Sequence, residues 1–185
     1  MKVVLIAPYI SINVDKELER DNFYPSAALL YLAGAIRAHN HSSVILDFNN
    51  RVVHEAALRE DRVEYCKRVI LKTIEKEKPD LIGLNVLFSG NFPDVLKFAE
   101  VIKEKYPKIK IAVGGIHPTT YYKEILTNCS EIDYVAIGEG EMTLLKLIKC
   151  LENKNFEGLK NIKGFVHRDE SGKIHCNLER EFIED

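Results

Sequence analysis

A pair of adjacent glycines is the clearest candidate for a ligand site in this sequence. The pair follows an apolar run and opens the segment Gly114, Gly115, Ile116, His117, Pro118 and Thr119. Because glycine lacks a Cβ, such a pair lets a ligand approach the backbone closely. The same pair could instead serve only to turn the chain tightly into a helix that Pro118 starts, and the sequence supports both interpretations.

A second glycine-rich segment, Gly138-Glu139-Gly140-Glu141, superficially resembles a dinucleotide-binding fingerprint. Thr143 replaces the third glycine of that fingerprint, and two carboxylates would face the phosphates. The segment therefore argues against pyrophosphate binding. Both carboxylates suit the positive end of a following helix, where each stabilises by about 0.3–1 kcal/mol. Acid–base work by the pair is conceivable, although capping explains it without further assumptions.

The other polar residues form no evident catalytic or metal site. Ser89 lies in a loop but has no neighbouring general base. His117 could contact a ligand, yet no second His, Cys or carboxylate stands at a metal-binding spacing. The cysteines at positions 66, 129, 150 and 176 form neither a CxxC nor a CxxxCxxC motif. We expect no catalytic residue and no metal ligand in this chain.

Short apolar runs alternate with segments of helical period, which is typical of repeated βα units. The expected strands are residues 2–7, 44–47, 81–86, 109–113 and 134–137. The expected helices are residues 26–38, residues 58–77, a helix from 91 that stops at Pro107, a short helix from Pro118, and residues 142–151. Right-handed crossovers place helices on both faces of such a sheet. We predict a doubly wound α/β fold with a mostly parallel, five-stranded, Rossmann/flavodoxin-like sheet.

The pattern changes after Asn153, where residues 165–168 and 173–176 flank a turn at 169–172. This arrangement predicts a small C-terminal β-hairpin added to the main sheet. Residues 178–185 are charged and show no periodicity, and we expect them to begin a linker. We therefore divide the chain into an α/β domain, 1–153, and the hairpin with the start of the linker, 154–185.

Composition excludes several classes of partner. The formal net charge is only −2, which gives no field that favours nucleic acid or an anionic membrane. No apolar stretch approaches the roughly 20 residues of a membrane span, and the apolar start is too short for a signal peptide. We expect a cytoplasmic protein without nucleic acid or membrane partners.

The order of these features resembles the vitamin B12 (cobalamin)-binding domain at the N-terminus of many radical S-adenosylmethionine enzymes. The resemblance rests on residues 2–8, 24–27, 32–34, 44–47, 78–84, 113–119 and 133–141, with the hairpin at 164–174. It covers nearly the whole chain. Its most specific part is Gly-Gly-x-His-Pro-Thr followed, after a short helix, by Asp-Tyr-Val-x-x-Gly-Glu-Gly-Glu.

The resemblance implies a cobalamin over the carboxyl ends of the strands, with its nucleotide tail in a crevice between them. It implies cofactor-binding roles for Pro8, Tyr9, Ser89, Gly90, Gly114, Gly115, His117, Pro118, Thr119, Gly138, Glu139, Gly140 and Glu141. In the related methionine-synthase type, a DxHxxG motif after the first strand supplies a histidine to cobalt. Residues 8–24 contain no histidine, so we expect binding without that ligand.

The family's CxxxCxxC motif holds a [4Fe-4S] cluster and leaves one iron open to S-adenosylmethionine. This sequence lacks the motif, so the resemblance implies that cluster and S-adenosylmethionine belong to a radical SAM catalytic domain in cis, downstream and missing here. We expect an excised domain or a truncated relative of a methyltransferase-like parent, without catalysis of its own.

Two other functions stay open. The domain could have kept the fold but lost cobalamin, serving as an interaction or structural domain. It could instead be an independent flavodoxin-like protein that binds a flavin or nucleotide, although no phosphate-binding loop supports this and fold alone does not specify function.

Overall fold

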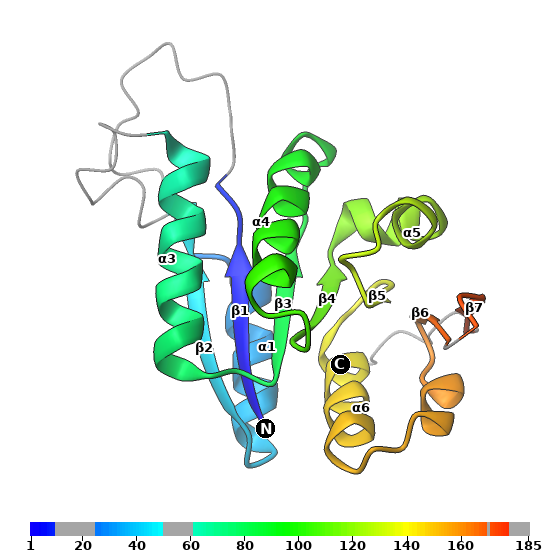
Figure 1. The fold of residues 1–185 in the computed structure, drawn as a ribbon. Coiled ribbons are helices and arrows are strands. Elements are labelled where there is room, and N and C mark those ends of the chain that lie inside the picture. The colour runs from blue at the N-terminus through cyan, green and yellow to red at the C-terminus, as the bar shows by residue number, and fades with distance from the viewer. Residues whose placement is uncertain (10–24, 50–60, 170, 178–185) are drawn as a thin grey trace.

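A mixed sheet forms the centre of the protein, whose computed structural model describes residues 1–9, 25–49, 61–169 and 171–177 (Figure 1). Within these residues the sheet has seven strands in the order β2-β1-β3-β4-β5-β6-β7. The strands are β1 (Lys2–Ala7), β2 (Ser42–Asp47), β3 (Leu81–Asn85), β4 (Lys110–Gly114), β5 (Tyr134–Ala136), β6 (Phe165–Arg168) and β7 (Ile174–Cys176). Strands β1 to β5 are parallel, and β6 and β7 join antiparallel.

Helices cover both faces of this sheet, as predicted. They are α1 (Ala27–Ala38), α3 (Arg62–Glu77), α4 (Phe92–Lys105), α5 (Ile116–Asn128) and α6 (Glu141–Glu152), with short 3-10 turns η3 (Ser89–Asn91) and η4 (Glu157–Asn161). Helices α1 and α6 share one buried cluster, and α3, α4 and α5 share the other. None of the helices in the described ranges has the length and apolar character needed to cross a bilayer.

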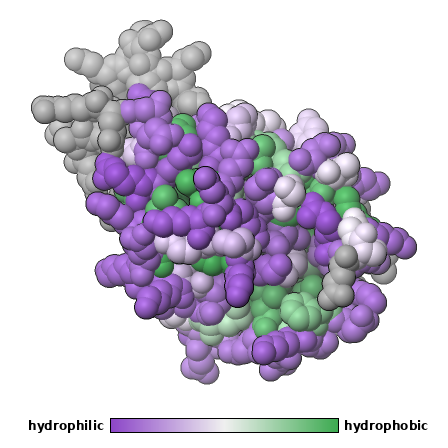
Figure 2. All heavy atoms as spheres, in the orientation of Figure 1, coloured by the Kyte–Doolittle hydropathy of each residue, from purple (hydrophilic) through white to green (hydrophobic). Residues whose placement is uncertain are grey.

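Strand β1 shows how the sequence builds two cores. Val3 and Leu5 pack into the cluster under α1 and α6, whereas Val4 and Ile6 pack into the cluster under α3, α4 and α5. Successive side chains of a strand point to opposite faces, so a strand buried on both faces is a continuous apolar run. Most of the outer surface visible in Figure 2 is hydrophilic by contrast, with hydrophobic residues in small areas.

The helix starts follow local capping chemistry. The Ser26 hydroxyl accepts a hydrogen bond from the Leu29 N–H at 3.5 Å, and the Asp61 carboxylate accepts from Val63 and Glu64 at 2.9 and 3.1 Å. Helix α3 was predicted to start at 58, and its described part starts at Arg62. Residues 58–60, together with 10–24 of the first loop and 178–185 of the expected linker, lie outside the described residues.

Helix α5 begins two residues before the predicted Pro118 because Gly115, with a φ of +112°, reverses the chain directly after β4. Pro118 is tolerated in the first turn, where backbone N–H groups have no partner within the helix.

The predicted hairpin continues the main sheet through a row of rings. Tyr134 and Phe165 lie 5.5 Å apart between ring centroids, Phe165 and His167 5.6 Å, and His167 and His175 5.3 Å. His175 Nε2 is 2.6 Å from an Asp169 carboxylate oxygen. His167 is 4% exposed, and its Nδ1 is buried without a hydrogen-bond partner among the described residues.

Candidate cofactor-binding site

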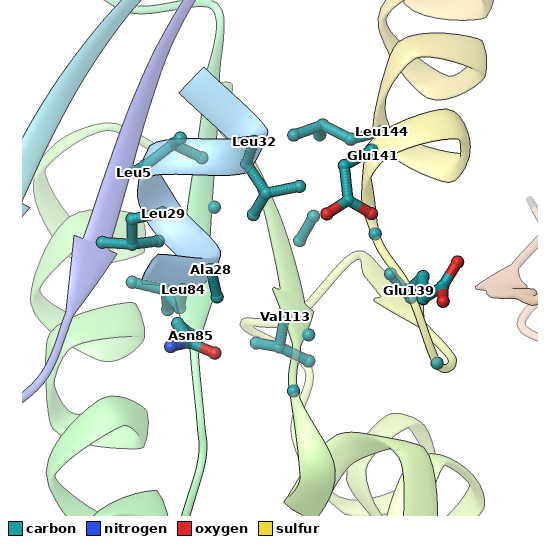
Figure 3. Close-up of a pocket in the computed structure, with 17 residues that line it drawn as sticks. Leu5, Ala28, Leu29, Leu32, Leu84, Asn85, Val113, Glu139, Glu141 and Leu144 are labelled. Atoms are coloured by element: carbon teal, nitrogen blue, oxygen red, sulfur yellow. The ribbon is translucent and has the colours of Figure 1, made fainter. Parts of the chain in front are cut away.

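A cavity of about 180 Å³ opens at the carboxyl ends of the parallel strands, between α1 and α6 (Figure 3). Strand order reverses here, because α1 leads from β1 to β2 while β3 lies on the other side of β1. Open parallel sheets bind ligands at this kind of switch point. Both glycine-rich segments therefore reach the edge of the sheet at which ligand sites form.

The cavity has apolar walls and a floor of small residues. One wall comes from α1, with Ala28, Leu29 and Leu32, and the opposite wall includes Leu144 of α6. The strand residues of the lining are Leu5, Gly83, Leu84, Ala112, Val113, Gly114 and Ala136. Four of these strand positions on β3 to β5 carry glycine or alanine, namely Gly83, Ala112, Gly114 and Ala136. Because these residues have little side-chain volume, the space above them stays open.

The two adjacent glycines have different structural roles. A Cβ on Gly115 would lie 2.6 Å from the Val86 carbonyl oxygen, and its φ of +112° is one that other residues rarely adopt. A Cβ on Gly114 would meet nothing closer than the Ala136 Cβ at 3.7 Å. Gly115 therefore makes the turn into α5, whereas the missing side chain of Gly114 leaves room in the cavity. The turn interpretation applies to Gly115, and Gly114 leaves the space that the ligand interpretation requires.

Thr119 joins the two glycine-rich segments. Its hydroxyl donates to the Gly115 carbonyl at 2.8 Å and accepts from the Gly138 N–H at 3.0 Å. Gly138 has a φ of +70°. The segment at 138–141 is thus fixed against the start of α5 before it enters α6.

The two glutamates of this segment point in different directions. In Figure 3 the Glu141 carboxylate is turned toward the cavity and that of Glu139 is turned outward. One Glu141 oxygen, Oε2, is buried and has no hydrogen-bond partner among the described residues. No Lys, Arg or His among the described residues lines the cavity, so this carboxylate has no counter-charge from that part of the chain.

A second group of predicted residues lies beside the cavity and not in its lining. The His117 ring sits between Phe92 and Tyr121, with centroids 4.6 and 4.8 Å away, and its Nδ1 is 2.9 Å from the Ser89 hydroxyl. Burial lowers the pKa of His117 below its usual value, which favours the neutral ring near pH 7. Its Nε2 is buried without a partner in the described part of the chain.

Tyr9 is also buried beside this edge, with its hydroxyl 2.6 Å from the Arg62 guanidinium and its carbonyl oxygen bound by the Asn91 amide. Pro8, Gly90 and Pro118 likewise stay outside the lining. The structure thus brings together Gly114, Gly115 and residues 138–141 in the cavity. It places the other predicted residues around it.

The contributions of the α1 wall and of Asn85 to the cavity were not predicted from the sequence. Asn85 ends β3, inside the predicted strand 81–86, and contributes an amide to the cavity. Its position as the last strand residue at the carboxyl edge was the available signal. Among the described residues no group of three His, Cys, Asp or Glu could hold a metal ion.

Several known proteins are similar to this chain in sequence. The anaerobic magnesium-protoporphyrin IX monomethyl ester cyclase of Synechocystis sp. is 29% identical over 144 residues, which cover 78% of this chain and 26% of the cyclase. An uncharacterized methyltransferase of Pyrococcus horikoshii is 29% identical over 184 residues, covering 100% of this chain and 36% of that protein. The chain thus spans about a quarter to a third of the length of these curated relatives.

A solved structure has the same fold. It is the cobalamin-dependent S-adenosylmethionine radical enzyme OxsB with aqua-cobalamin and S-adenosylmethionine bound, with a TM-score of 0.71 and 21% identity. The alignment covers 98% of this chain and 22% of that enzyme. The family model described as the B12 binding domain matches residues 18–148. That match takes in most of the sequence, and the chain belongs to the B12-binding domain family.

Proposed function

We propose that this chain binds cobalamin and presents it to a radical S-adenosylmethionine catalytic domain on the same polypeptide, in a methyltransferase-like parent enzyme. The observation that carries the proposal is the open cavity at the carboxyl edge of a B12-binding domain. When bound, cobalamin supplies a cobalt ion that can carry an alkyl group.

The size of the cavity fits one part of such a cofactor. Pockets that enclose a whole small ligand are about 300–1,000 Å³, and this cavity is about 180 Å³. It suits the nucleotide tail of cobalamin, with the apolar walls of Leu29 and Leu144 beside the base, while the wide corrin ring stays outside.

The surface next to the cavity suits a wide, largely apolar group. Leu87, Phe88 and Ile116 are 39%, 50% and 64% exposed, and they project from the loop after β3 and from the start of α5. The backbone N–H of His117 donates a hydrogen bond to the Val86 carbonyl oxygen at 3.2 Å, which connects these two segments. Exposed apolar side chains grouped near a cavity are typical of a binding surface.

The residues predicted from sequence divide into two roles under this proposal. Gly114, Gly115 and residues 138–141 surround the tail. Pro8, Tyr9, Ser89, Gly90, His117, Pro118 and Thr119 hold the edge of the sheet over which the ring lies.

Cobalt receives no histidine from the first loop, since residues 8–24 contain none. The paramagnetic resonance spectrum of the protein loaded with cob(II)alamin tests this point. We expect no splitting from a protein nitrogen. A splitting that changes when the protein is labelled with ¹⁵N would contradict it.

Retention of the cofactor tests the main proposal. The purified chain is incubated with hydroxocobalamin and desalted, and visible absorbance near one equivalent per chain is expected. Ala28→Leu places a large side chain at the cavity wall, whereas Ala27 is outside the lining. We expect Ala28→Leu to weaken binding about tenfold or more and Ala27→Leu to have little effect. Failure of the wild-type chain to retain cobalamin would refute the proposal.

The other two functions predict different results. A domain that had lost cobalamin would have bulky side chains beside Gly114, but the nearest side-chain atom to a Cβ there is that of Ala136. The sequence offers no phosphate-binding loop for a flavin or nucleotide. Thermal stabilisation by a nucleotide but not by cobalamin would favour that function.

A further inference from the structure

Glu141 places a carboxylate oxygen in the cavity without a hydrogen bond. Its Oε2 is buried, and no donor contacts it among the described residues. Buried polar atoms nearly always have a partner, so an exception in a binding cavity indicates that a ligand supplies the donor. Glu141 is the first residue of α6, where the positive end of the helix supports a carboxylate.

The surroundings of this oxygen limit what can donate to it. Leu32 and Leu144 lie beside it in the cavity lining, and no cationic side chain is part of that lining. An anionic group would be repelled, and a purely apolar group would leave the oxygen unsatisfied. The fitting partner is a neutral donor such as a sugar hydroxyl.

We propose, on the basis of the cobalamin-binding function above, that Glu141 Oε2 accepts a hydrogen bond from a ribose hydroxyl of the nucleotide tail. Glu141 is then a residue that selects corrinoids with a nucleotide tail. The proposal requires the phosphate of the tail to lie farther from this carboxylate than the ribose does.

Binding affinities for two corrinoids distinguish a contact between Glu141 and the tail from an effect on the rest of the cofactor. Hydroxocobalamin carries the nucleotide tail, and cobinamide lacks its ribose, phosphate and base. Their affinities are measured by absorbance titration or calorimetry with the full chain and with three variants. Glu141→Gln keeps the shape and removes the charge, Glu141→Leu removes the acceptor, and Glu124→Gln makes the same exchange at an exposed position of α5 outside the cavity lining.

We expect Glu141→Leu to weaken hydroxocobalamin binding by about 10- to 100-fold, since a hydrogen bond to a charged group is lost from a buried site. Glu141→Gln should cause a smaller loss. Cobinamide binding should change by less than about twofold in both variants, and Glu124→Gln should change neither affinity by more. Thermal unfolding of each variant verifies that it is folded.

Equal losses for the two corrinoids, or no loss for cobalamin, would overturn the role of Glu141 while leaving cobalamin binding intact. If the wild-type chain binds neither corrinoid, the proposed function itself fails.

Discussion

The side-chain hydroxyl of Thr119 accepts a hydrogen bond from the backbone N–H of Gly138 across 3.0 Å, so one residue of α5 fixes the loop that precedes α6. The same hydroxyl donates to the Gly115 carbonyl at 2.8 Å. The two glycine-rich segments are 19 residues apart in the chain at these contacts, and their relative position depends on this bridge.

Thr119→Val should break both hydrogen bonds with little change in volume. We expect a loss of about 1–2 kcal/mol in the free energy of unfolding, and cobalamin binding weakened several-fold because the loop at 138–141 is released. Urea denaturation and absorbance titration measure the two effects. Thr120→Val is the matched control, since the exposed Thr120 hydroxyl bonds only the Ile116 carbonyl of its own helix at 3.1 Å. Equal effects at both positions would refute a bridging role.

Gly115→Ala should destabilise the fold severely. The added Cβ meets the Val86 carbonyl oxygen at 2.6 Å in a backbone conformation with a φ of +112°. We expect a loss of at least about 3 kcal/mol. Gly138→Ala has open space at a φ of +70° and should cost only about 1 kcal/mol. Gly90→Ala, which also has open space and no positive φ, should stay within about 0.5 kcal/mol. A mild effect at 115 in urea denaturation would contradict the close contact.

His167→Phe should flatten the dependence of stability on pH. Burial, and then the neighbouring His175, lower the pKa of His167. The unfolded chain therefore takes up a proton near pH 6.5 before the folded chain does, and stability falls as the pH drops from about 6.5 toward the folded pKa. Phenylalanine keeps the ring in the row and removes the unpartnered Nδ1, which should add about 1 kcal/mol at pH 7.

Thermal unfolding of wild type and His167→Phe between pH 7.5 and 5 measures this effect. His117, whose pKa is lowered by burial, contributes in the same direction and keeps part of the slope in the variant. Identical slopes for the two proteins would show that His167 does not titrate with unfolding.

The four cysteines should react in an order set by exposure and pKa. Cys176 is exposed, while Cys66 is 1% exposed and burial raises its pKa to about 12. Since the thiolate is the nucleophile, a maleimide at pH 7.5 should modify Cys176 first and Cys66 only on unfolding. Mass spectrometry of the labelled peptides reports the order, and Cys176→Ser should remove the fast phase. Early labelling of Cys66 would contradict its burial.

The framework of the fold was predictable because its signals are local. Strand β1 has the predicted bounds, and the other parallel strands differ from theirs by one or two residues. Runs such as 3–7 are apolar at successive positions because both of their faces are covered, and a strand is the short element that suits this. The hairpin at its predicted place has the same origin in local turn chemistry.

The composition of the cavity was predictable only in part. Gly114, Gly115 and residues 138–141 follow strands directly, so their place at the edge came from topology. Leu29 is a buried residue of α1, and nothing in the local sequence shows that this face of the helix also lines a cavity. Two other features depend on how the helices pack against the sheet, which no local pattern encodes. They are the hydrogen bond between Thr119 and Gly138 and the packing of His117 against Phe92.

The division of tasks between Gly114 and Gly115 has an evolutionary consequence. A larger residue at 115 damages the protein itself, so selection for folding alone keeps that glycine. A larger residue at 114 could be accommodated by the backbone while it occupies the cavity. In a lineage that no longer needs the cofactor, substitutions should therefore accumulate at position 114 long before position 115. The residue at 114 distinguishes relatives under selection for ligand binding from relatives that retain only the fold.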